Sequence, residues 1–150
     1  MGIDRREQIL ARLLVIATGI PGITTAVRNK FGGLNETDLD AIAICDGEEQ
    51  GDERDPENTR PTNAPRRIVM MPSIEISAAG PPETVGTTIN GYRAKLVKGI
   101  CSDATLISLC TDRTGIRYLG CQSGAGLGST MDANMVLQFA FTYRLFPDEL

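Results

Sequence analysis

The chain has 150 residues, 41% hydrophobic and 23% charged, a composition typical of a single globular domain spanning residues 1–150. No apolar run reaches 18 residues and the first residues lack a secretory layout, so we expect a protein without a membrane segment, made in the cytosol. The net charge of −4 lies entirely in residues 47–65, where six acids accompany two arginines. This distribution disfavours tight nucleic-acid binding, which requires a basic surface.

The chain contains four cysteines and no histidine. The cysteines, Cys45, Cys101, Cys110 and Cys121, form no CxxC pair, so neither a zinc site nor a disulfide framework is expected. We interpret them as buried free thiols. Because histidine is absent, Ser-His-Asp and Cys-His catalytic groups are excluded.

The first predicted element is a helix over residues 4–17. Asp4 and Glu7 fit a capping box, and the apolar positions that follow have helical spacing. Four polar residues of this helix are predicted to face water: Arg5, Arg6, Gln8 and Arg12. A loop follows over residues 22–40, with a short strand near residues 24–28.

Two strands are expected on either side of the acidic segment. Residues 41–45, "AIAIC", form a continuous apolar run, as in a strand covered on both faces. Residues 67–77 alternate, with Ile68, Met70, Ile74 and Ile76 on one face. Pro72 cannot donate to a ladder and therefore marks an edge or a bulge.

The second half of the chain predicts a helix and then a hairpin. From Pro82 the apolar stripe is Val85, Ile89, Tyr92, Leu96 and Ile100, and Asp103 is expected to cap a short helical turn over residues 106–109. Strands are predicted at residues 114–122 and 134–145, the second placed centrally because it carries three aromatic residues on one face. The fold class is therefore α+β: a mixed, largely antiparallel sheet of about four strands, two main helices packed on it, and a long acidic loop between the first two strands.

Residues 47–65 form the acidic segment between these two strands. Ordering 19 residues costs on the order of 20–40 kcal/mol of backbone entropy, and no cluster of apolar side chains offsets it. We therefore expect a mobile loop that a partner orders; the alternative is a tolerated surface insertion without a role. The candidate contacts to a partner or a second copy are Glu48, Glu49, Asp52, Glu53, Arg54, Asp55, Glu57, Arg60, Arg66 and Arg67.

Other chemical interpretations of the sequence are weaker. "GAGLG", residues 124–128, is followed by a strand and not by a helix, so it indicates a hairpin loop and not a dinucleotide site. The acids of the 47–65 segment do not have the spacing of an EF-hand, and solvated carboxylates are poor acid–base catalysts. We expect no enzymatic activity, no cofactor and no metal.

The order of elements resembles that of the tail terminator proteins of long-tailed bacteriophages, the lambda minor tail protein U type. The segments that carry the resemblance are "AIAICDGEE", "RRIVMMPSIEIS", "CSDATLISL", "GIRYLGCQ" and "ANMVLQFAFTYRL". The likeness is one of pattern and order over nearly the whole chain.

This resemblance implies a structural virion protein assembled in the host cytoplasm. Members of the family form a six-membered ring on the tail tube, stop its polymerisation and present a surface to the head connector, while DNA only passes through the bore. Two alternatives remain: another head–tail connector or neck protein, and a small ligand-binding or enzymatic α+β domain with a pocket between residues 85–100 and the sheet.

Overall fold

The computed structural model describes residues 2, 4–29, 38–53, 61–111, 115–125 and 132–150. The elements run in the order α1 (Arg5–Thr18), β1 (Thr25–Arg28), β2 (Ala41–Gly51), β3 (Arg66–Ala79), α2 (Pro82–Cys101), α3 (Ala104–Leu109), β4 (Ile116–Ala125) and β5 (Asp132–Leu145), followed by the short 3₁₀ helix η4 (Pro147–Glu149). The strands form one sheet in the order β1-β2-β3-β5-β4. β1 is parallel to β2 and the other pairs are antiparallel. The α+β class is confirmed.

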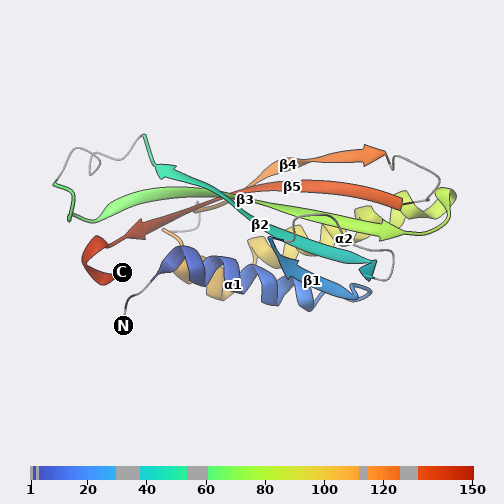
Figure 1. Cartoon of the computed structure of the whole chain (residues 1–150), viewed down its shortest axis with the longest axis horizontal. Helices are drawn as coiled ribbons and strands as arrows, with labels where there is room; N and C mark the ends of the chain where they lie inside the picture. The colour runs from blue at the N-terminus through green and yellow to red at the C-terminus, as the bar shows by residue number, and fades with distance from the viewer. Residues whose placement is uncertain (1, 3, 30–37, 54–60, 112–114, 126–131) are drawn as a thin grey trace.

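The helices form a second layer on one side of the sheet, and the strands lie along the long axis of the molecule (Figure 1). Ile9, Leu10 and Leu13 of α1 are buried, as are Leu96 and Ile100 of α2. They belong to one hydrophobic core with the sheet residues that face them, which include Ile42, Ile74, Leu137, Phe139 and Phe141. The apolar stripes predicted from the sequence therefore face the core, as expected.

Three helix-start and strand predictions are confirmed. The Asp4 carboxylate accepts the Glu7 N–H at 3.3 Å at the start of α1, and the Asp103 carboxylate accepts the Leu106 N–H at 2.9 Å at the start of α3. Pro72 lies in the central strand β3, where the regular pairing with β5 lapses between Met70 and Ser73. The proline thus occupies an irregular position of the ladder, where no N–H is needed.

The sequence-based bounds of the acidic loop are wrong at its start. Gly47–Gly51 belongs to β2 and pairs with β3, and two more residues of the segment, Asp52 and Glu53, are described beyond the end of the strand. The sequence indicated a loop because these residues are polar, but ladder hydrogen bonds to an already formed neighbour do not require apolar side chains. Among the described residues the sheet has five strands where about four were expected, and the short strand predicted near residues 24–28 is β1. The two main helices expected are α1 and α2, and the short helical turn expected after Asp103 is α3.

The cysteines are free thiols, but only part of the burial prediction holds. Cys110 is buried, and burial raises the pKa of its thiol to about 12. Cys101, the last residue of α2, and Cys121, on β4, are exposed. An outer strand of a sheet and the end of a helix leave side chains open to solvent, which a count of cysteines does not reveal.

Candidate functional site

The candidate site is the end of the β2–β3 hairpin, residues 48–53 and 66–71, which we call the acidic arm. A bulge between Cys45 and Glu48 separates it from the first half of β2. Gly47 lies in this bulge with φ +71°, and a Cβ atom there would lie 2.1 Å from the Met71 carbonyl oxygen. Glycine is therefore required for the close approach of the two strands at the base of the acidic arm.

Glu49 joins the acidic arm to both layers of the fold. The Tyr143 hydroxyl donates to Glu49 Oε2 at 2.5 Å, and Arg6 Nε lies 3.5 Å from the same oxygen. Arg6 also donates through Nη2 to the Gly47 carbonyl at 3.1 Å. Burial and the bond to Glu49 raise the pKa of Tyr143 above its ordinary value, so the hydroxyl keeps its proton and remains a donor.

Arg28, the last residue of β1, ties α1 to the base of the acidic arm. Its guanidinium donates to Glu7 at 2.6 Å and to Asp46 at 3.0 Å. Burial alone would raise the pKa of Asp46, but hydrogen bonds from Arg28 and from the Asn29 side chain offset this and hold the pKa below its ordinary value. Asp46 is therefore ionised and paired at neutral pH.

The ten candidate residues fall into different environments. Glu48 is exposed and opposite Met71, on the sheet face away from the helices, whereas Glu49 faces α1. Asp52 is only 7% exposed, and its N–H donates to the Arg67 carbonyl at 3.0 Å. Glu53 is exposed. Arg54, Asp55, Glu57 and Arg60 lie outside the described residues.

The two arginines at the start of β3 also differ in their neighbours. Arg66 is opposite Leu145 and donates through Nη2 to the Pro61 carbonyl at 3.3 Å, while Arg67 is opposite Arg144. Both are half-buried. The structure thus places six of the ten candidates on or beside one hairpin, with Glu49 turned inward.

Sequence reasoning missed the residues that hold the acidic arm. Arg6 was predicted to face water, but it contacts Glu49 and Gly47; Arg12, predicted to face water as well, pairs with Asp103 at 2.7 Å. Tyr143 lies 94 positions from Glu49 in the chain. An arginine on the polar side of a predicted helix does not by itself indicate an ion pair. Whether it forms one depends on which acidic residue the fold brings next to it.

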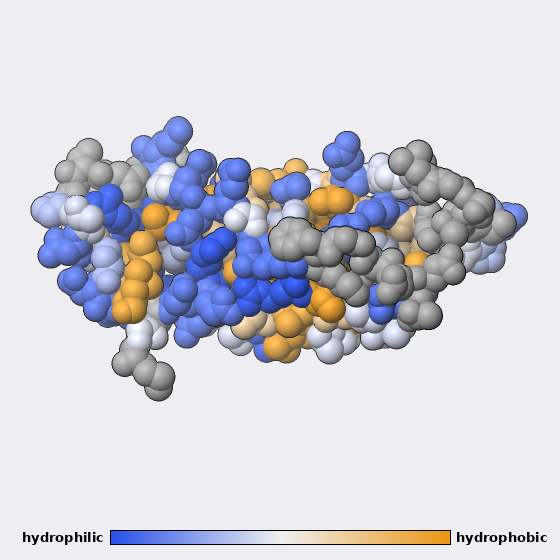
Figure 2. Space-filling view, viewed as in Figure 1, coloured by the Kyte–Doolittle hydropathy of each residue, from blue (hydrophilic) through white to orange (hydrophobic). Residues whose placement is uncertain are grey.

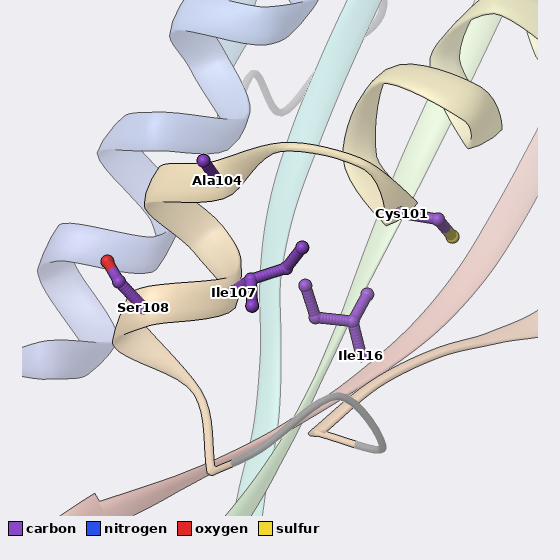
Figure 3. A pocket seen from close by; sticks show the side chains of 5 residues that line it. All are labelled: Cys101, Ala104, Ile107, Ser108 and Ile116. Carbon is purple, nitrogen blue, oxygen red and sulfur yellow. The ribbon is translucent and has the colours of Figure 1, made fainter.

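A shallow pocket lies between α2, α3 and β4 (Figure 3). Its volume is about 450 Å³, and its lining residues come from the end of α2, from α3 and from the start of β4: Cys101, Ala104, Ile107, Ser108 and Ile116. Ile107 and Ile116 face each other across it. Among these lining residues the polar side chains are one thiol and one hydroxyl, so the described lining offers no carboxylate or amine for acid–base chemistry.

The surface and the described side chains show no further candidate centre. Hydrophobic residues on the face in Figure 2 form separate patches among hydrophilic ones. In the part of the chain that the structure describes, no group of three or more cysteines and acids is placed to hold a metal ion. No helix among those residues combines the length and apolar character needed to cross a bilayer.

No protein-family model matches the chain, and a search of curated proteins finds no match.

Proposed function

We propose that the chain is a structural subunit of a bacteriophage tail. Six copies form a ring at the head-proximal end of the tail tube, stop its polymerisation and provide the surface to which the head is joined. Its partners are further copies of itself, the tail tube protein and the head connector protein, and DNA passes through the bore without a specific contact.

The observation that carries this proposal is the position of the acids. Glu48 and Glu53 are exposed at the end of β2, where β2, β3 and β5 lie side by side, and neither residue lines the pocket of Ile107 and Ile116. Arg6 and Arg28 hold the base of the arm in place through ion pairs. Exposed carboxylates at the end of a sheet suit contact with another protein better than chemistry on a small substrate, because no carboxylate lines the described pocket.

The element order supports the same proposal. The chain runs through a helix, the strands β2 and β3 with the acidic segment between them, a second helix, a short third helix and a final hairpin. The resemblance to tail terminators rests on this order; the short parallel strand β1 is not part of it. Six copies would gather 6 × −4 = −24 formal charges, and those that line a bore would repel DNA and let it pass.

A second candidate is another neck component that binds the portal side first. A ligand-binding domain is the third, but the place expected for its pocket, between α2 and the sheet, is filled by Ile89, Tyr92, Leu96 and Ile100 of the core.

The test uses the tail tube protein encoded in the same genome. Purified chain is added while tube subunits polymerise, and tube lengths are measured in negatively stained images. We expect shorter tubes with a density at one end, and a length that falls as the chain concentration rises. Unchanged lengths, with binding to the portal or connector instead, would move the proposal to the second candidate.

A further inference from the structure

β4, the last strand of the sheet, has one edge that pairs with no other described strand. In the order β1-β2-β3-β5-β4 it has a single neighbour, β5. The N–H and C=O groups that point away from β5 can therefore bind a further strand. Residues 121–124, in the second half of β4, are all exposed, so this part of the edge is open to a partner.

The apolar pocket lies beside the start of the same edge. Ile116, the first residue of β4, lines it and faces Ile107 of α3 (Figure 3). Ile116 is opposite Phe141 and packs against the core, so its side chain lies on the helix side of the sheet. A strand added to β4 would present alternate side chains on that side. The pocket volume of about 450 Å³ leaves room for one large apolar side chain of such a strand.

Two arginines border this edge, one on each face of the sheet. Arg117 is exposed and opposite Ala140, on the face that the helices leave open. Arg93 of α2 lies on the helix side, where its Nε donates to the Tyr118 hydroxyl at 3.3 Å and its guanidinium carbon lies 5.9 Å from the centre of the tyrosine ring. A strand at this edge would therefore have a cation beside it on either face.

Few carboxylates offset these two charges. α3 and β4 contain no acidic residue, and the one in α2, Glu83, is in the first turn, at the opposite end of the helix from the pocket. Asp103, which precedes α3, is paired with Arg12 at 2.7 Å. Although the chain has a net charge of −4, this edge is complementary to an acidic partner.

A bulge between Tyr118 and Gly120 divides the edge into two parts. Residues 120–125 pair regularly with β5 and offer a continuous ladder, whereas the pocket lies beyond the bulge, beside Ile116. β4 has 10 residues, so an extended segment of about ten residues reaches from the far end of the ladder to the pocket.

We propose that β4 binds an extended, acidic segment of another protein as an additional strand. The segment pairs with residues 120–125, places one large apolar side chain in the pocket, and brings carboxylates beside Arg117 and Arg93. This docking site goes beyond the proposed function and does not depend on the ring, because a single copy of the chain carries the whole site.

The probe is a fluorescein-labelled synthetic peptide of about ten residues, the length of β4, that alternates glutamate with valine and has one valine replaced by phenylalanine. Two versions carry the phenylalanine near the C-terminus or near the N-terminus, which suits an antiparallel or a parallel strand. Fluorescence anisotropy with the full chain measures the dissociation constant. We expect one version to bind at least about tenfold more tightly than the other, because only one direction brings the phenylalanine to the pocket.

N-methylated forms of the tighter peptide test the strand pairing without any change in the protein. An N-methyl group removes a backbone donor, as proline does. In one form the even-numbered residues are methylated and in the other the odd-numbered ones, so only one form loses the N–H groups that face β4. We expect that form to lose binding and the other form to retain it.

Variants of the chain test the pocket and the charge. Ile107→Glu places a carboxylate in the pocket and should weaken binding at least about tenfold. Arg117→Glu should weaken it about three- to tenfold at low salt. The matched controls are Val15→Glu on α1, where Val15 is 56% exposed, and Lys95→Glu on the exposed side of α2; both should bind as wild type does. Thermal unfolding of each variant is measured beside the wild type.

Binding that is lost in one methylated form, and is weakened by Ile107→Glu but not by Val15→Glu, supports the proposal. Equal binding of the two methylated forms would overturn it, and so would no binding of either peptide at about 1 mM. An apparent affinity that falls as the chain concentration rises would show that a second copy occupies β4, which also overturns it. If Ile107→Glu unfolds, the methylated peptides still decide. None of these outcomes alters the tube-length test of the proposed function.

Discussion

At the scale of single residues, ion pairs and hydrogen bonds between distant parts of the chain fix the base of the acidic arm and the ends of the helices. Arg28 bridges Glu7 of α1 and Asp46 of β2. Arg12 holds Asp103 through two hydrogen bonds, of 2.9 and 2.7 Å. Asp103 also caps α3, so one carboxylate positions a short helix against α1.

Asp103→Asn should destabilise the protein in a way that depends on pH. Hydrogen bonding to Arg12, acting against burial, holds the pKa of Asp103 below its ordinary value. A lowered pKa stabilises the folded state above the unfolded-state pKa of about 4, and this stabilisation is lost as the pH falls through the lower, folded-state pKa. The variant retains a capping oxygen, so its free energy of unfolding at pH 7 should be only about 1 kcal/mol lower than that of the wild type.

Urea unfolding of both proteins at pH 7 and at a pH of about 2.5, below the ordinary aspartate pKa, measures this difference, which should shrink at the lower pH. A difference of the same size at both pH values would mean that the ionised carboxylate is not what stabilises the contact.

At the scale of elements, the acidic arm depends on the bulge in β2. Gly47 has a positive φ, and a Cβ atom at this position would collide with the backbone of Met71. This bulge lets β2 continue along β3 after β1 has ended, so the strand reaches Gly51. The geometry of the acidic arm thus depends on this backbone position as well as on the contacts of Glu49 with Arg6 and Tyr143.

Gly47→Ala should cost about 2 kcal/mol or more of unfolding free energy, because the added methyl group meets the Met71 carbonyl and the backbone is strained at positive φ. The matched control is Gly86→Ala in α2, where a Cβ meets no atom within 4 Å. That variant should be unchanged or gain up to about 1 kcal/mol, since alanine favours a helix more than glycine does.

Chemical denaturation of the two variants provides the comparison. Equal stabilities of Gly47→Ala and Gly86→Ala would contradict the role assigned to the bulge.

The sequence was sufficient for the elements that bury an apolar stripe. The periodicity of α1, α2, β3 and β5 reports directly which side faces the core, and their positions and order were predicted. The continuation of β2 to Gly51 was not, because polar residues in a ladder have no apolar signal and are stabilised by backbone pairing. The contacts of Arg6 and Tyr143 with Glu49, which join α1 and β5 to β2, were not predicted from the sequence either.

At the scale of the whole molecule, the two faces and two edges of the sheet are unequal. The described helices all cover one face, and the free edges differ in side-chain charge: Glu48 on the β2 side and Arg117 on the β4 side. The sequence analysis predicted the acids of residues 47–65 and the strand over residues 114–122, but not their places in the sheet, since strand order is a property of the fold.

The central claim, that this chain is a ring-forming assembly subunit, is tested most directly by native mass spectrometry over a wide concentration range, with negative-stain images of the same samples. We predict closed six-membered rings that become more populated as the concentration rises and less populated as salt screens the charged edges. A chain that stays monomeric throughout, or forms a stable dimer at every concentration, would contradict this claim.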